Sequence, residues 1–316
     1  MFAVEYPILR ASVCVSASTT RHSNESWPGK YKQCLPCAEL DDLKARVPLE
    51  KQRIGAQAWE YRINQAPIAT GSRCGLKTRA YHKLKEIFLT CAIDPPSISV
   101  HLCEAPGAFV LATSELVSSA ALSTLSTSNS TVIPTWTWIA FTLHDVDAPV
   151  PMHNLPMESG QFVFSDVRDY DSCIVHLKRG EACLVTADGA TEMDHATIEE
   201  HHIDLLTAQT RIALFCLRKG GTYILKFFEG RAWHTRRCIA WLTTVFNDGV
   251  SIIKPTSSRP TNSERYLVAR GYVGGSIELP DLNTIVVADE WYDELNLVIE
   301  RMLQDQIKHL RALIRL

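Results

Sequence analysis

The sequence predicts an α/β fold in which a mainly parallel sheet ends in an antiparallel pair of strands. Apolar runs alternate with helix-compatible segments from residue 97 onwards, which is typical of parallel strands joined by helices. The last two apolar runs follow each other closely with no helix between them, and this favours an antiparallel pair. Parallel strands place their carboxyl ends at one edge of a sheet, so ligands should bind at that edge.

The segment SISVHLCEAPGAF, Ser97–Phe109, predicts a buried strand, a tight turn and the start of a helix. The apolar run ends abruptly at Ala105, Pro106 and Gly107, and residues 108–117 are compatible with a helix. Glycine lets a ligand approach the backbone closely, and a helix N-terminus presents unpaired N–H groups. We therefore predict a nucleotide-binding corner, although any doubly wound α/β protein contains several such corners.

Seven apolar runs, each bounded by glycine, proline or polar residues, predict seven strands. They lie at residues 97–102, 136–143, 161–166, 182–190, 220–230, 251–255 and 264–272. Helical patterns cover residues 75–88, 108–117, 194–217, 233–246 and 290–316. The proline-rich loop 144–156 follows the second strand, so we expect it at the edge where ligands bind.

The chain is expected to have three parts. These are an N-terminal extension over 1–70, a main domain over 71–280 and a C-terminal helix over 281–316. Residues 1–36 mix Ser, Thr, Pro and Gly with scattered apolar positions, which predicts a loosely organised arm or a small appended element. A helix-like pattern over 38–64 is interrupted at Pro48. The apolar stripe over 290–316 predicts a helix that packs on the body or meets a partner, and we favour packing.

The composition of the chain excludes several classes of protein. With 46% hydrophobic and 21% charged residues, the chain can bury a full core. A formal net charge of -3 excludes a broadly basic nucleic-acid coat, so any RNA contact must come from local patches. No apolar run reaches the roughly 18 residues of a membrane span, and residues 1–15 lack a signal-peptide pattern. Ten widely spread cysteines are typical of a reducing compartment, so we expect an intracellular protein with no membrane contact.

Cys34 and Cys37 form a C-x-x-C pair, which raises the possibility of a metal site. Zinc would need two further ligands, and His22 and Cys14 lie upstream at no familiar spacing. We therefore expect two loop cysteines and no metal.

Four charged residues lie in, or at the end of, elements that can reach the carboxyl edge of the sheet: Lys83, Asp188, Lys226 and Glu264. Lys226 stands inside an apolar strand, where a lysine is costly unless it serves a purpose. Two lysines and two carboxylates in one cleft can handle protons, because each lysine would lower the pKa of the other while the acids hold the geometry.

Five segments resemble, in the same order, the motifs of FtsJ-like RNA 2'-O-methyltransferases. RAYHKLKEI (79–87) resembles the helix of the first catalytic lysine, and LCEAPGAF (102–109) resembles the S-adenosylmethionine loop. VTADG (185–189), ILKFFEG (224–230) and KPTSSRPTNSERYLV (254–268) resemble the segments of the catalytic aspartate, second lysine and glutamate. Within the family, the residues of these segments are most similar to those of the cap-specific mRNA nucleoside 2'-O-methyltransferases of eukaryotes and viruses.

The resemblance implies the Rossmann-like fold of class I S-adenosylmethionine-dependent methyltransferases. Such a fold has a seven-stranded, mainly parallel sheet with an antiparallel last strand and helices on both faces. The resemblance also implies methyl transfer to the ribose 2'-OH of a cap-proximal mRNA nucleotide, with S-adenosylhomocysteine as the product. Lys83, Asp188, Lys226 and Glu264 would form the catalytic tetrad. Lys226 would be neutral enough to accept the hydroxyl proton, or would hold the oxygen's lone pair in line.

The resemblance also implies a set of cofactor-binding residues: Cys103, Glu104, Ala105, Pro106, Gly107, Ala108, Phe109, Asp166 and Asp188. Asp166 matches the position that binds the adenine, and the alternative is an ordinary aspartate at a strand end. One position departs from the family, which often has an acidic residue where this chain has His101. Glu104 is then the candidate for receiving the cofactor's ammonium.

Capped RNA is the partner that the resemblance implies, with other capping or polymerase components as further candidates and the oligomeric state left open. The expected RNA-binding residues are Lys77, Arg79, Lys254, Arg259, Asn262 and Ser263. One alternative substrate is an internal site in rRNA or tRNA. Another reading is an inactive RNA-binding scaffold, which has no need to retain all four charged residues of the tetrad.

Overall fold

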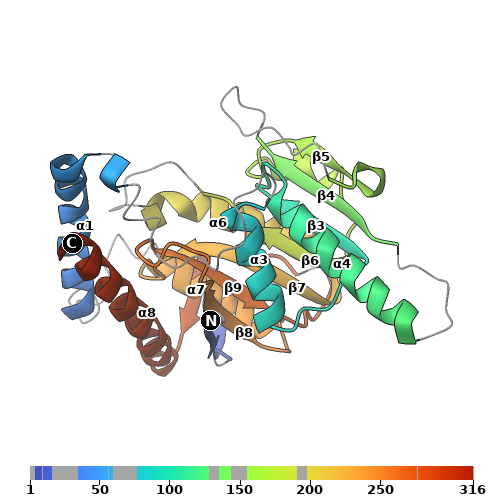
Figure 1. The fold of residues 1–316 in the computed structure, drawn as a ribbon. Helices are drawn as coiled ribbons and strands as arrows, with labels where there is room; N and C mark the ends of the chain where they lie inside the picture. Colours follow the sequence, from blue (N-terminus) through green and yellow to red (C-terminus); the bar gives the residue numbers. More distant parts are fainter. Residues whose placement is uncertain are drawn as a thin grey trace.

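One eight-stranded sheet organises the chain. The computed structural model describes residues 4–8, 10–15, 35–55, 57–59, 77–127, 135–143, 155–190, 198–275 and 277–315. The strands of the sheet are β1 (Val4–Ile8), β3 (Ile98–Leu102), β4 (Thr137–Thr142), β5 (Gly160–Phe164), β6 (Ala182–Ala187), β7 (Leu217–Phe228), β8 (Val250–Lys254) and β9 (Glu264–Ala269). Their order across the sheet is β1-β8-β9-β7-β6-β3-β4-β5, and Figure 1 shows them as one twisted layer.

The strand directions match the prediction. β3 pairs in parallel with β4 and β6, β4 pairs in parallel with β5, and β6 pairs in parallel with β7. β9 runs antiparallel to both β7 and β8, so the expected antiparallel end of the sheet is confirmed. All seven predicted strands are present.

β1 is an eighth strand that the sequence did not predict. It pairs antiparallel with β8, from Val4 opposite Lys254 to Ile8 opposite Val250. Pro7 lies inside it, and proline lacks the N–H that a central strand would need, so this strand suits only the edge of a sheet. The start of the chain therefore completes the main sheet.

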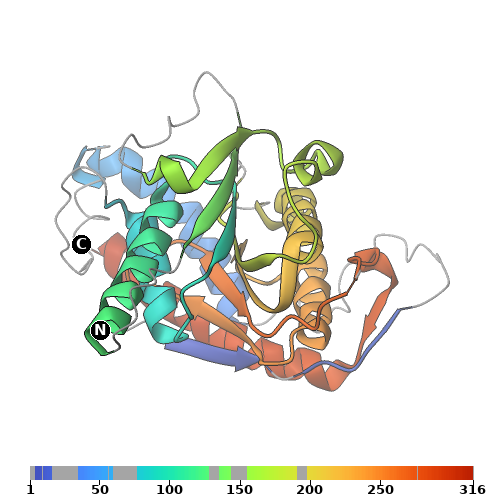
Figure 2. The ribbon, with the colours of Figure 1, turned by 90° about the vertical axis from the view of Figure 1, so that its right-hand side faces the viewer.

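Helices cover both faces of the sheet. The α3 (Arg79–Thr90) and α4 (Ala108–Thr127) helices lie on one face, and α6 (Ile198–Cys216) and α7 (Trp233–Val245) lie on the other, as Figure 2 shows with the sheet seen between them. Successive strand residues point to opposite faces: Leu184 packs in the cluster of α3 and α4, and Val185 packs in the cluster of α6 and α7. Burial on both sides explains why the parallel strands are continuous apolar runs.

Two terminal helices lie beside this core. The α1 helix (Leu35–Ile54) packs against α8 (Asp289–Arg315), as Figure 1 also shows. The apolar stripe of α8, which includes Trp291, Leu295 and Leu303, is buried in the main core cluster. Smaller elements are β2 (Val13–Val15), which pairs with β10 (Ile285–Val287), together with α5 (Tyr170–Ile174), η1 (Met157–Ser159) and η2 (Leu282–Thr284). Within the described residues, no helix has both the length and the apolarity needed to cross a bilayer.

Candidate active site

The four charged residues singled out in the sequence meet as two ion pairs. Lys83 on α3 lies with its Nζ 2.8 Å from the Glu264 carboxylate at the start of β9. Lys226 in β7 lies with its Nζ 3.0 Å from Asp188 Oδ1, just after β6, and also donates to the Asp188 backbone carbonyl at 2.5 Å. Each lysine therefore has its own carboxylate.

The register of β7 and β9 brings the two ion pairs together. Lys226 lies opposite Tyr266, and Phe228 lies opposite Glu264, so Lys226 and Glu264 are diagonal neighbours on one face. Burial lowers the pKa of Lys226, but the charges of Asp188 and Glu264 outweigh burial and raise it. Burial alone would raise the pKa of Glu264, but Lys83, Lys226 and Lys254 together lower it to about 2. Lys226 is therefore an ammonium in the free protein, whereas its position in an apolar strand beside Lys83 predicted a lowered pKa.

Three further contacts hold the acids, and the sequence analysis did not assign them. The Tyr266 hydroxyl donates to Asp188 Oδ1 at 2.7 Å, and the Ser258 hydroxyl donates to Glu264 Oε1 at 2.7 Å. The Lys254 Nζ donates to the Glu264 backbone carbonyl at 2.8 Å. Strand alternation offered a signal for Tyr266, two residues after Glu264, but no local pattern marks Ser258.

The α3 helix also fixes the loop that precedes β9. The carboxylate of Glu86, one turn after Lys83, accepts from the backbone N–H of Thr256 at 2.6 Å and of Ser257 at 3.0 Å. Both loop residues immediately precede Ser258. A single helix therefore positions Lys83 and the loop whose serine binds Glu264.

We call the turn between β3 and α4, residues 103–107, the cradle. Gly107 has φ +102°, and a Cβ there would lie 2.4 Å from Leu155 Cδ1. Across the loop, a Cβ at Gly189 would lie 2.6 Å from Gln209 Oε1 and 3.0 Å from Cys103 Sγ. Only glycine fits at either position without a rearrangement.

Glu104 lies buried in this cradle. Its Oε1 accepts from the backbone N–H of Phe109 in the first turn of α4 at 2.7 Å. Burial raises the pKa of Glu104 to about 8, which outweighs the hydrogen bonds that lower it. The carboxyl is therefore mostly protonated at neutral pH, and a nearby cation would ionise it.

His101 lies in the core between strands. One ring nitrogen lies 2.9 Å from Ser99 Oγ and the other 2.8 Å from Thr186 Oγ1. Burial lowers the pKa of His101 to about 3, so the ring is neutral. Because both nitrogens have partners, His101 offers no group to a cofactor, and Glu104 stays the candidate for an ammonium.

Asp166, two residues after β5, is held by a neighbouring arginine. The Arg168 Nε lies 2.9 Å from Asp166 Oδ2, and the side-chain hydrogen bonds from Arg168 lower the pKa of Asp166. Together with Glu104 and Asp188, this carboxylate gives three acids from three strand ends. The charges of that set fit S-adenosylmethionine, which carries an ammonium and a sulfonium.

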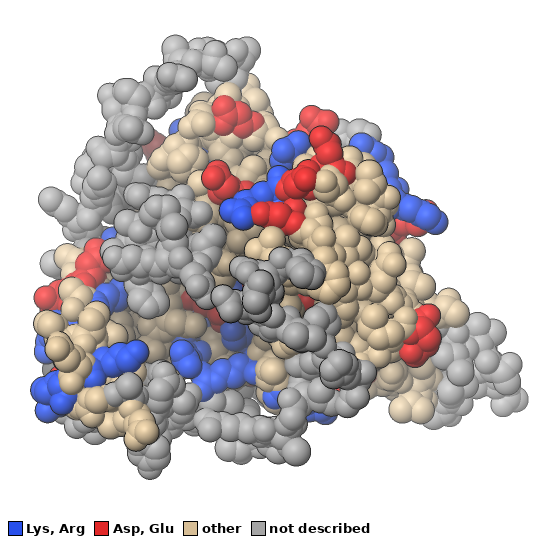
Figure 3. All heavy atoms as spheres, turned by 90° about the horizontal axis from the view of Figure 1, so that it is seen from above, with Lys and Arg blue, Asp and Glu red and all other residues tan. Residues whose placement is uncertain are grey.

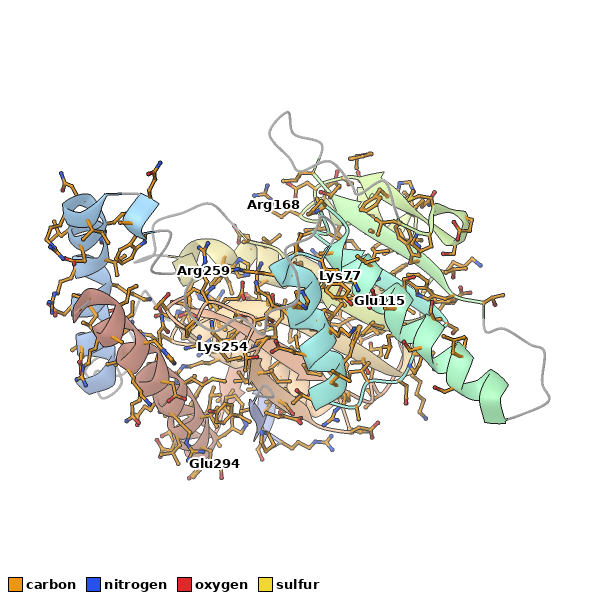
Figure 4. The ribbon with its side chains drawn as sticks, in the orientation of Figure 1. Lys77, Glu115, Arg168, Lys254, Arg259 and Glu294 are labelled. Atoms are coloured by element: carbon orange, nitrogen blue, oxygen red, sulfur yellow. The ribbon has the colours of Figure 1, made fainter. Side chains whose placement is uncertain are left out.

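The predicted RNA-binding residues fall into two groups. Lys77 and Arg259 are exposed, and Lys77 pairs with Glu115 on α4 at 2.8 Å (Figure 4). Arg79 is partly exposed at the start of α3. Lys254, by contrast, donates to the Asn262 carbonyl at 3.0 Å and contacts the Asn262 side chain.

Ser263 also points inward, since its hydroxyl donates to Glu229 Oε1 at 2.6 Å. Lys254, Asn262 and Ser263 are thus engaged within the protein, and their role as RNA contacts stays a prediction. In Figure 3, the Lys and Arg side chains of the described residues form separate groups with acidic groups among them.

No group of three or more His, Cys, Asp or Glu suited to a metal ion is found in the described part of the chain. Cys34 and the side chain of Cys37 lie outside that part, so the prediction for this pair is not tested.

Comparison with known proteins shows the family to which the chain is similar. Residues 76–272 match the family model for FtsJ-like methyltransferases. A cap-specific mRNA (nucleoside-2'-O-)-methyltransferase of Autographa californica nuclear polyhedrosis virus is 33% identical over 147 residues, covering 45% of this chain and 51% of the relative. The cap-specific mRNA (nucleoside-2'-O-)-methyltransferase 2 of Danio rerio is 28% identical over 235 residues, covering 62% and 28%. A probable methyltransferase of African swine fever virus is 28% identical over 262 residues, covering 74% and 58%. The chain thus spans between 28% and 58% of the lengths of these relatives.

Proposed function

Because the chain belongs to the FtsJ-like methyltransferase family, we propose that it methylates the ribose 2'-OH of a cap-proximal mRNA nucleotide. The observation that carries this proposal is the pair of adjacent ion pairs, Lys83 with Glu264 and Lys226 with Asp188, at the carboxyl edge of the sheet. The cradle at Gly107 lies at the same edge, after β3. Both parts of the proposed methyl-transfer site would therefore share this edge of the sheet.

S-adenosylmethionine would supply an electrophilic methyl group on a sulfonium and leave as S-adenosylhomocysteine. Residues 103–109 would hold it against the backbone of the β3–α4 loop, with Glu104 facing its ammonium and Asp166 its adenine. Asp188 contacts Lys226 and would also face the cationic donor, which suits a residue that aligns cofactor and substrate.

Lys226 would bind the 2'-oxygen. As an ammonium, it donates hydrogen bonds, so it holds the oxygen by one lone pair and directs another toward the methyl group. Asp188 holds Lys226 in place and is itself held by the Tyr266 hydroxyl, and Glu264 adds a second negative charge nearby. This charge state favours the aligning role of Lys226 over that of a neutral base. The hydroxyl proton would then pass to water as the O–CH3 bond forms and the S–CH3 bond breaks, so that the products would be the 2'-O-methyl ribose, S-adenosylhomocysteine and H+.

Capped RNA is supported as the substrate by two observations. The relatives from the baculovirus and from zebrafish are named as cap-specific enzymes. Lys77, which pairs with Glu115, and Arg259 are exposed and would contact RNA phosphates. A contribution from phosphate contacts predicts affinity for RNA that falls with added salt.

The test compares two short RNAs of the same sequence. One has a cap and a free 2'-OH on its first nucleotide, and the other has a 5' triphosphate in place of the cap. Methyl transfer from radiolabelled S-adenosylmethionine is followed, and nuclease mapping locates the modified nucleotide. We expect label at the first nucleotides of the capped RNA and at least a 100-fold loss with Lys226→Met, whereas the exposed Lys51→Met should match the parent. Equal labelling by parent and Lys226→Met would refute the role of Lys226, and equal labelling of both RNAs would refute the cap requirement.

A further inference from the structure

A buried polar network lies behind Glu264, and part of it comes from a helix outside the family-matched residues. Its centre is Glu229, which follows β7 directly and is only 6% exposed. Glu229 Oε1 accepts from the Ser263 hydroxyl at 2.6 Å and forms an ion pair with Lys44 of α1. The Glu229 backbone N–H donates to the Ser263 carbonyl at 3.0 Å. Ser263 is thus held at two points, and the next residue is Glu264.

We infer that Lys44 is a positioning residue for the active site, which acts through Glu229 and Ser263 on the carboxylate of Glu264. The kinetic part of this inference rests on the proposed function. The structural part, a brace from α1 to the start of β9, does not.

The backbone at Glu229 needs such a brace. Its φ of +40° lies in the left-handed region, which a residue with a side chain adopts only when its surroundings hold it there. The following segment is fixed as well, because the Glu199 carboxylate on α6 accepts from the N–H groups of Gly230, Arg231 and Ala232 at 2.8, 2.9 and 2.9 Å. The position of Glu229 is therefore set from both sides, and Lys44 holds the oxygen that binds Ser263.

The α1 helix reaches this network through a second residue. The Arg231 guanidinium lies 3.2 Å from Glu229 Oε2 and forms two hydrogen bonds with Asp41, at 2.7 and 3.0 Å. Loss of Lys44 would therefore leave Glu229 with a cation on its other oxygen. For this reason we expect the main effect on geometry rather than on folding, because the buried charge keeps a partner.

A brace from the C-terminal helix completes the set. Gln306 on α8 donates to the Thr261 carbonyl at 3.0 Å, and its Oε1 accepts from Arg265 at 3.2 Å. The residues on both sides of Glu264 are thus held from behind by α1 and α8. Since misplacement of a catalytic group by about 1 Å can cost about 100-fold in rate, small shifts here matter.

The test uses Lys44→Met, the charge-retaining Lys44→Arg and a control, Lys51→Met, on the exposed side of the same helix. Capped RNA is the substrate for kcat and both KM values, and hydrogen exchange is measured on peptides covering residues 261–269. For Lys44→Met we expect kcat to fall at least tenfold with both KM values within twofold of the parent, and exchange at 263–266 to rise. Lys44→Arg should recover most of kcat, and Lys51→Met should match the parent in every readout.

A double mutant separates a relay from two independent effects. If Lys44 acts through Ser263, Lys44→Met combined with Ser263→Ala should lose no more kcat than the stronger single variant. Multiplicative losses, or unchanged exchange and kcat in Lys44→Met, would overturn the inference. If the parent itself methylates no RNA, the proposed function fails, and the exchange data alone decide whether α1 braces Glu264.

Discussion

The substitution Glu104→Gln gives a sharp test of the cofactor cradle, because it removes one buried titration. Burial raises the pKa of Glu104 from 4.5 to about 8 in the folded protein. Between these values the folded protein binds more protons than the unfolded chain, so the parent loses stability as pH rises from 4.5 to 8. One proton changes the free energy of unfolding by about 1.4 kcal/mol per pH unit. From pH 5 to pH 7 this amounts to about 3 kcal/mol, which the glutamine variant does not lose.

Urea unfolding of the parent and of Glu104→Gln at pH 5, 6, 7 and 8 measures this effect. The remaining titrating groups are common to both proteins and cancel when one free energy is subtracted from the other. We expect the free energy of unfolding of the variant, minus that of the parent, to rise steadily up to pH 8 and to stay constant above it. A difference that does not change with pH would mean that the folded protein holds Glu104 ionised, and the reasoning from burial would be wrong.

The same variant tests whether Glu104 receives the cofactor's ammonium. A carboxyl with a pKa of about 8 is mostly protonated at pH 7, and a bound ammonium would displace that proton. Calorimetric titration with S-adenosylmethionine in buffers of different ionisation enthalpy should therefore show release of more than half a proton by the parent. Glu104→Gln should release almost none. Equal release by the two proteins would assign the ammonium to another group.

Three more substitutions probe the neighbouring contacts. Tyr266→Phe removes the hydrogen bond to Asp188 and should lower kcat for methyl transfer about tenfold, which steady-state kinetics on capped RNA would measure; an unchanged kcat would make this hydroxyl dispensable. Gly107→Ala strains a φ of +102° and drives a methyl group into Leu155, so the free energy of unfolding should fall by more than about 1 kcal/mol in urea titrations; a stability equal to that of the parent would contradict the clash. Asp188→Asn removes the larger of the two charges that raise the pKa of Lys226, so burial should then lower the pKa of Lys226. Because Lys226 would lose its ammonium form as pH rises, residual methyl transfer measured from pH 6 to 9 should fall over that range.

The sheet could be predicted from the sequence because its parallel strands are apolar on both faces. Every residue of Ala182–Ala187 except Cys183 is buried, so this strand has a continuous apolar sequence that can be recognised. β1 has no such pattern, since it is five residues long, contains Pro7 and pairs only at the edge. Its place depends on a partner some 240 residues later in the chain, β8, and no local pattern encodes that pairing.

The site was only partly predictable, for a similar reason. The five motifs named the family, which is confirmed, and the four charged residues do meet. Which lysine pairs with which carboxylate depends on the register of β7 against β9 and on where α3 crosses β9. The sequence also could not show that Ser263, within the NSERY segment, points inward to Glu229. The sequence of a loop does not show whether a serine side chain points into the protein or to solvent.

The charge on Lys226 separates the two roles that the sequence left open. A neutral lysine can accept the hydroxyl proton, whereas an ammonium can only hold the oxygen by donating to it. In the free protein two carboxylates keep this buried lysine charged, and one of them, Glu264, stays ionised because Lys83 lies against it. Lys83 thus favours the ionised form of Glu264, whose charge raises the pKa of Lys226. If alignment is what Lys226 provides, methyl transfer by Asp188→Asn must weaken as pH rises; if it were a base, the same variant would gain activity over the same range.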